Sequence, residues 1–168
     1  MYIFDNTESF ESFYKMYCHD LVRFAYYYVH DVSIAEDIVQ DVFLTLWKKR
    51  SKFKSQNHLQ AYLYKVTKNA ALMVLRKRKI RQKFKNEQTE ELAKSPADEL
   101  FESDLDKVYH HAIFTLPEKC RVIFCMSRID GLTYKEIAQT LGISIKTVET
   151  QIGRALITLR KRLSAYLT

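Results

Sequence analysis

The sequence predicts an all-α fold of two small helical domains joined by an acidic, flexible linker, with a helix-turn-helix in the C-terminal domain. Apolar residues recur at spacings of three and four in both halves of the 168-residue chain, as on the buried side of an amphipathic helix. Hydrophobic residues make up 47% of the sequence, which is ample for buried cores. Charge gives the third observation, because an acidic block separates two basic ones.

The charge blocks predict the domain boundaries. Residues 1–85 contain 16 Lys and Arg against 8 Asp and Glu, residues 86–107 contain 2 against 8, and residues 108–168 contain 9 against 4. Pro96 would break any helix in the middle block. We therefore expect two domains that bind polyanions, at 1–85 and 108–168, and a tether at 86–107.

The first helix is expected from about Phe10 to Val29. Its apolar face consists of residues at helical spacing, namely Phe13, Tyr17, Leu21, Phe24, Ala25 and Tyr28. The adjacent Tyr26, Tyr27 and Tyr28 could offer stacking surfaces to bases, but packing between helices is the simpler use of these rings.

The second helix is expected to open at a capping box formed by Ser33 and Glu36 and to run past Trp47. Its apolar face comprises Ile34, Ile38, Val39, Val42, Phe43, Leu46 and Trp47. On the other side, polar residues gather within one turn, namely Asp37, Gln40 and Asp41. This patch could dock a basic protein surface, or it could be favourable charge near a helix N-terminus. Periodicity alone leaves both readings open.

A polar loop leads into a third helix that becomes increasingly cationic. The residues expected to pack inward are Tyr62, Leu63, Val66, Ala70 and Met73, and those expected on the opposite surface are Lys65, Lys68, Asn69, Leu72 and Arg76. The loop supplies further donors and acceptors from Ser55, Gln56, Asn57 and His58. Cations suit phosphates, and amides suit exposed base edges. The helix continues into the basic run "RKRKIRQK". A charge run is usually a solvated face, but this one extends a helix that already carries amides and lysines, so we favour contact with nucleic acid.

The C-terminal stretch predicts a helix-turn-helix. Thr133 and Glu136 form a capping box, Gly142 ends that helix, and Ser144 can cap the next. The second helix has an apolar stripe of Ile145, Val148, Ile152, Ala155, Leu156, Leu159 and Leu163. Its opposite side carries groups suited to base edges and phosphates in a major groove, namely Lys146, Thr147, Thr150, Gln151 and Arg154. The alternative is an ordinary helical hairpin with a solvated polar face.

Composition argues against several other classes. The three glycines all lie in the C-terminal third, so the sequence has neither a glycine-rich phosphate cradle nor a dinucleotide fingerprint. The N-terminus has acids where a signal peptide needs basic residues, and no apolar run reaches spanning length. We therefore expect a cytoplasmic protein without membrane insertion and without a cofactor.

The cysteines fit a reduced interior. Cys18, Cys120 and Cys125 are odd in number and form no CxxC pair. A metal site could combine two of them with His110 and His111, but the spacing matches no zinc pattern, so no metal is expected.

Taken in order, these segments resemble the small sigma factors of bacterial RNA polymerase, of the extracytoplasmic-function type of the sigma-70 family. "AEDIVQDVFLTLW" resembles the family's polymerase-docking segment, and "AYLYKVTKNAALMVLRKRK" resembles its promoter-melting helix. The stretch from "LPEKC" to "RKRL" resembles its C-terminal DNA-binding domain. The likeness covers nearly the whole chain.

The resemblance implies roles for particular residues. Asp37, Gln40 and Asp41 would bind the clamp helices of core RNA polymerase. The loop at 53–58, with Lys65, Lys68 and Asn69, would contact the melted strand of the minus-ten element, while Lys146, Gln151 and Arg154 would read the duplex minus-thirty-five element. Tyr62 stands where relatives commonly have Trp, and Gln151 where a small hydroxyl residue is frequent. Relatives often have an anti-sigma factor, and their linker threads the polymerase interior, although a solvated tether fits the charge equally well.

The resulting prediction is a non-enzymatic sigma factor that directs promoter recognition and transcription initiation. One alternative is a helix-turn-helix regulator that acts without docking to core polymerase. Another is a nucleic-acid hydrolase with Asp37, Asp41 or Glu36 as metal ligands, but no histidine or second acidic cluster lies nearby in the sequence.

Overall fold

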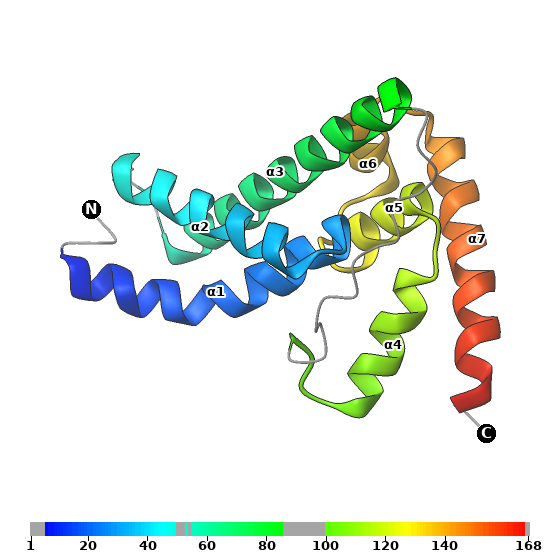
Figure 1. The fold of residues 1–168 in the computed structure, drawn as a ribbon, viewed down its shortest axis with the longest axis horizontal. Coiled ribbons are helices and arrows are strands. Elements are labelled where there is room, and N and C mark those ends of the chain that lie inside the picture. Colours follow the sequence, from blue (N-terminus) through cyan, green and yellow to red (C-terminus); the bar gives the residue numbers. More distant parts are fainter. Residues whose placement is uncertain (1–5, 50–52, 54, 86–99, 167–168) are drawn as a thin grey trace. The chain divides into compact units, whose positions relative to one another are not determined.

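The computed structural model describes residues 6–49, 53, 55–85 and 100–166. This part of the chain contains seven α-helices and no strand (Figure 1). The chain divides into two compact units, Met1–Ala97 and Asp98–Thr168, each with its own core. The prediction of an all-α chain with two helical domains is confirmed.

Helix α1 spans Thr7–Val29. It starts at a capping box in which the Asn6 side chain accepts a hydrogen bond from the Ser9 amide at 2.8 Å. Tyr26, Tyr27 and Tyr28 are all buried, so these rings pack in the core and offer no stacking surface. The expectation of packing between helices is therefore confirmed.

Helix α2 spans Val32–Lys49 and begins before the predicted cap. The Asp31 carboxylate accepts a hydrogen bond from the Ile34 amide at 3.0 Å, so Asp31 caps the helix and Ser33 lies inside its first turn. The predicted capping box of Ser33 and Glu36 is wrong for this reason. The predicted apolar face is confirmed, since Ile38, Val39, Val42, Phe43 and Leu46 are buried, with Ile34 and Trp47 half-buried.

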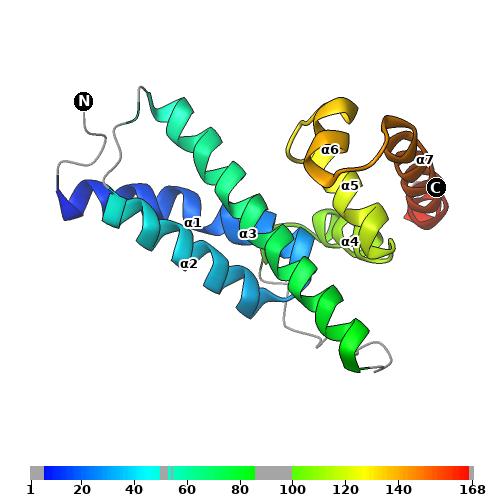
Figure 2. The same cartoon turned by 90° about the horizontal axis from the view of Figure 1, so that it is seen from above.

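Helix α3 spans Gln56–Lys85 and crosses α1 and α2, which lie side by side (Figure 2). The Ser55 hydroxyl accepts a hydrogen bond from the His58 amide at 3.3 Å, so it caps this helix. Residues 56–58, predicted to belong to a loop, are its first turn.

The buried side of α3 is rotated from the predicted one by about one residue position. Its centre is formed by residues spaced by four, namely Leu59, Leu63, Thr67, Ala71 and Leu75. Lys68 and Leu72 are also buried, whereas Met73 is 55% exposed. The prediction of an open Lys68 and Leu72 and an inward Met73 is wrong. A threonine and a lysine on the buried side interrupt its apolar pattern in the sequence.

The second unit contains α4 (Asp104–Phe114), α5 (Glu118–Arg128), α6 (Tyr134–Leu141) and α7 (Ile145–Leu163), followed by a 3₁₀ turn at Ser164–Tyr166. Helix α7 packs against the three helices before it, and Figure 1 shows it alongside α4 and α5. The predicted linker at 86–107 overlaps the first turn of α4, whereas Pro96 lies outside the described residues.

The helix-turn-helix has the predicted caps. The Thr133 amide donates to the Glu136 carboxylate at 2.8 Å, and the Glu136 amide donates back to the Thr133 hydroxyl at 3.3 Å. Gly142 ends α6 in the left-handed region at φ 65°, and Ser144 accepts from the Thr147 amide at 3.0 Å.

The apolar stripe of α7 is narrower than predicted. Val148, Ile152, Ala155 and Leu159 are buried and Leu163 is half-buried, but Ile145 is 46% exposed and Leu156 is 44% exposed. The prediction that Ile145 and Leu156 are core residues is wrong. Both lie at one edge of the stripe, beyond the reach of the neighbouring helices.

Two glycines of this unit should respond to alanine in opposite ways. Because Gly142 has φ 65°, Gly142→Ala should lower the free energy of unfolding by about 1 kcal/mol. Gly153 lies inside α7 and a Cβ there would meet no atom within 4 Å, so Gly153→Ala should raise the free energy of unfolding by about 0.5–1 kcal/mol. Urea unfolding of the full chain, followed by circular dichroism, measures both changes. Shifts of the same sign for the two variants would contradict this account of the backbone.

Candidate functional site

An acidic face lies on the outer side of α2. Asp37, Gln40 and Asp41 are all exposed, and their spacing of three and four places them on one side of the helix. Leu44, one turn beyond Gln40, extends this side and is 54% exposed. We call Asp37, Gln40 and Asp41 the acidic face. The structure therefore brings the three predicted docking residues together and adds an exposed leucine that the sequence analysis missed.

An open polar face lies on α3. His58, Lys65, Asn69 and Arg76 are exposed and recur at spacings of seven and four, so they share one side of the helix. Lys68 does not belong to this face, because it is buried. We call His58, Lys65, Asn69 and Arg76 the open face of α3.

The remaining predicted residues of this region have other positions. Ser55 caps α3 through its hydroxyl, and the Gln56 amide lies 4.0 Å from the sulfur of Met16 on α1. The side chain of Asn57 is outside the described residues. Tyr62 is half-buried, with its ring centroid 5.3 Å from that of Phe53. These residues lie around the start of α3, apart from the row that Lys65, Asn69 and Arg76 form.

One cation of the basic run has a structural contact. The guanidinium of Arg78 donates a hydrogen bond to the backbone carbonyl of Val29 at 2.6 Å. Val29 is the last residue of α1, a helix with no basic residue in its last turn. A cation from another helix therefore stabilises the negative end of the α1 dipole and one of its free carbonyls. No pattern in the sequence indicates this pairing, since 49 residues separate the partners.

The outer side of α7 carries the predicted recognition residues. Lys146, Thr150 and Arg154 are exposed and form a row spaced by four. Thr147 and Gln151 are half-buried at the edge of this row. The row has a cation at each end, Lys146 and Arg154, and faces away from the buried stripe. All five predicted residues therefore lie on, or at the edge of, the outer side of the helix.

Two of the three cysteines, Cys120 and Cys125, are buried in the second unit. Burial raises the pKa of the Cys125 thiol to about 12, and burial also raises the pKa of Cys120. Burial therefore disfavours the reactive thiolate form of both side chains at neutral pH. The described residues contain no group of three or more His, Cys, Asp or Glu side chains that could hold a metal ion.

One unit contains a helix-turn-helix, which is typical of DNA-binding proteins, and the other has an acidic face on α2 and an open polar face on α3. Residues 13–81 match the family model of sigma-70 region 2, and residues 107–159 match that of sigma-70 region 4. The chain therefore belongs to the sigma-70 family. It is an RNA polymerase sigma factor of the extracytoplasmic-function type, a subunit for promoter recognition and not an enzyme.

Similarity to other sigma factors covers most of the chain. Sigma factor SigV of Bacillus subtilis is 29% identical over 145 residues, which cover 86% of this chain and 85% of SigV. The extracytoplasmic-function sigma factor SigW of the same organism is 27% identical over 169 residues, covering 94% of this chain and 90% of SigW. Among solved structures, the sigma factor RpoE of Bartonella quintana, crystallised with the anti-sigma factor NepR, matches with a TM-score of 0.63. That match has 24% identity and covers 94% of this chain and 98% of RpoE, and it supports the fold.

The contact of Arg78 predicts that Arg78 and the nearby Arg76 differ in how much they contribute to the free energy of unfolding. Arg78→Ala should lower the free energy of unfolding of the N-terminal unit by about 1.5–3 kcal/mol, because it removes a hydrogen bond from a charged donor. Arg76→Ala is the matched control and should change the free energy of unfolding by less than about 0.5 kcal/mol, since Arg76 is exposed. Urea unfolding of the full chain measures both. Equal stability of the two variants would show that the contact contributes nothing.

Proposed function

We propose that the two units divide the work of a sigma factor, the N-terminal unit docking on core polymerase and capturing the melted strand and the C-terminal unit reading duplex DNA. The observation that carries this proposal is the presence of two distinct polar faces on one unit. The acidic face is on α2 and the open face is on α3. A regulator that binds duplex DNA alone would need neither of them.

The acidic face suits a basic protein surface. Its two carboxylates and one amide are exposed on adjacent turns, so they can meet cations of a partner helix without losing contacts of their own fold. Asp31, and not a residue of the acidic face, provides the hydrogen-bonded cap of α2. Helix α2 also has no acidic residue in its first turn, so Asp37 and Asp41 lie beyond the turn in which the helix dipole acts most strongly, which supports docking over favourable charge at the helix N-terminus.

The open face of α3 suits unstacked DNA. Lys65 and Arg76 can neutralise phosphates, while the Asn69 amide and the His58 ring offer hydrogen bonds to exposed base edges. The half-buried Tyr62, which packs on Phe53, lies near the start of this helix and can support a base by stacking. Lys68 has no part in this assignment because it is buried.

The outer side of α7 suits a major groove. We assign Gln151 to a base edge, because an amide can pair with adenine, and Arg154 mainly to phosphate, because it lies further toward the C-terminal end. Lys146, Thr147 and Thr150 lie nearer the N-terminal end of the helix, which is the end that commonly faces the bases.

Two further properties belong to this proposal. The similarity to RpoE, which was crystallised with the anti-sigma factor NepR, supports an anti-sigma factor as a partner of this chain.

The described helices include none that is long and apolar enough to cross a membrane. A sigma factor works where the polymerase and the chromosome are, so we place the chain in the cytoplasm.

The docking assignment predicts the outcome of a charge reversal. Asp37→Lys combined with Asp41→Lys should abolish most promoter-directed transcription by purified core polymerase and weaken core binding by at least about tenfold, because cations would face cations. The matched control is Asp20→Lys, which reverses an exposed acid of α1. Core binding is measured by competition with labelled wild-type chain, and RNA start sites are sequenced. Normal competition by the double variant would exclude the acidic face from docking, and transcription that does not depend on this chain would exclude a sigma factor.

The recognition helix predicts different behaviour for an amide and a cation. Gln151→Ala should weaken the free energy of binding to the preferred promoter by about 1–3 kcal/mol and relax the preference at one base pair. Arg154→Ala should weaken binding to all sequences alike and reduce the salt slope by about one. Polymerase containing each variant can be tested on a promoter library at several salt concentrations. A uniform loss for Gln151→Ala, without a change in base preference, would contradict its assignment to base reading.

A further inference from the structure

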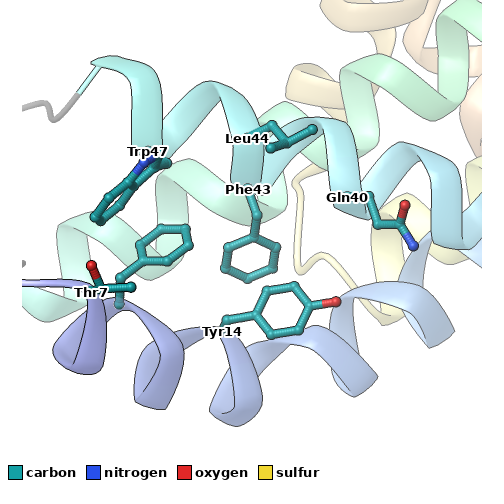
Figure 3. Close-up of a pocket in the computed structure, with 7 residues that line it drawn as sticks. Thr7, Tyr14, Gln40, Phe43, Leu44 and Trp47 are labelled. Carbon is teal, nitrogen blue, oxygen red and sulfur yellow. The ribbon is translucent and has the colours of Figure 1, made fainter.

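An apolar pocket lies between α1 and α2 in the N-terminal unit (Figure 3). It has a volume of about 430 Å³ and is lined by Thr7, Phe10, Tyr14, Gln40, Phe43, Leu44 and Trp47. Four of these residues are aromatic, and none carries a charge at neutral pH. The volume falls within the range of about 300–1,000 Å³ that is usual for sites that enclose a small ligand, so the pocket can hold a large side chain.

The walls of the pocket are held in place by contacts between the two helices. The ring centroids of Phe10 and Trp47 lie 4.8 Å apart, and those of Tyr14 and Phe43 also lie 4.8 Å apart. The rings of Phe10 and Phe43 meet edge to face at 6.1 Å. Each of these pairs joins α1 to α2, so the pocket exists before any partner binds, and filling it does not require the helices to separate.

The pocket is continuous with the acidic face. Gln40 belongs to both, and Figure 3 shows it at one end of the pocket. Leu44 lies four residues after Gln40 and three after Asp41, so it stands on the same side of α2 as the acidic face. It is 54% exposed although it lines an apolar pocket, which leaves hydrophobic surface uncovered beside two carboxylates.

We propose that this pocket receives one large apolar side chain from a helix of core RNA polymerase, whose neighbouring basic side chains meet the acidic face. The inference rests on the docking function proposed above and adds to it an apolar anchor. An anchor of this kind commonly supplies much of the affinity of an interface, while charges around it contribute more to the association rate and to specificity.

The surroundings of the pocket argue against two other occupants. Nucleic acid is disfavoured because the lining has no cation and the nearby carboxylates repel phosphates. A second copy of this chain, docked symmetrically, would bring two acidic faces together, and like charges across an interface oppose binding. A basic partner with an exposed apolar side chain can fill the pocket and pair its cations with the acidic face.

Two variants of the full chain test the anchor, one by removing a wall and one by filling the space. Leu44→Ala removes an exposed wall residue, and Thr7→Trp places a bulky ring at an exposed position of the lining. The matched control is Met16→Ala, because Met16 is an apolar residue of α1 that is 61% exposed and does not line the pocket. Core polymerase is the probe, and affinity is measured by competition with labelled wild-type chain at low and high salt.

Leu44→Ala and Thr7→Trp should each weaken core binding by about tenfold, and Met16→Ala should leave it unchanged. The losses should persist at high salt, whereas the loss caused by Asp37→Lys with Asp41→Lys should shrink, because salt screens charges. Circular dichroism and urea unfolding establish that each variant is folded as the wild type is.

If the charge reversal weakens core binding but neither pocket variant does, the anchor is wrong and the docking function stands. If no variant weakens core binding, the docking function itself is wrong. A free chain that sediments as a dimer, and becomes monomeric with Leu44→Ala, would assign the pocket to a second copy and overturn the proposal.

Discussion

One constraint governs both units: each contains a long helix, α3 in one and α7 in the other, that buries only one of its sides. In α3 the buried side is centred on Leu59, Leu63 and Leu75, and in α7 it is centred on Val148, Ile152 and Leu159. A helix with 3.6 residues per turn that commits one side to a core must leave the other side to solvent or to a partner. The side chains available for DNA are therefore determined by the same periodicity that holds each unit together.

The parts of the structure that depend on neighbouring residues could be predicted from the sequence. The caps at Thr133, Gly142 and Ser144 were found because a cap needs only residues within one turn of it. The acidic face was found for the same reason, since its members lie within four residues of one another. The start of α2 was missed because two polar residues, Asp31 and Ser33, could both have served as its cap, and only the former does.

The parts that depend on distant residues could not be predicted. The buried side of α3 includes Thr67 and Lys68, and no pattern in the sequence shows that polar residues are enclosed there. Arg78 looks like one more cation of a basic run until its contact with the carbonyl of Val29 is seen. The pocket between α1 and α2 takes its walls from two helices, so neither helix shows it by itself. Contacts between elements, and not the elements themselves, account for these errors and omissions.

The buried thiols of the C-terminal unit bear on how the protein withstands oxidants. Peroxides and disulfides react with the thiolate form of cysteine, and the pKa of Cys125 is raised to about 12 by burial. Cys120 is buried too, and its sulfur is engaged with the backbone carbonyl of Gln151 at 3.3 Å. Both groups stay protonated and shielded at neutral pH, which makes the first step toward sulfenic acid slow. The two thiols of α5, the helix that packs against α7, are therefore poor targets for oxidants, and oxidation in the core of this unit starts slowly.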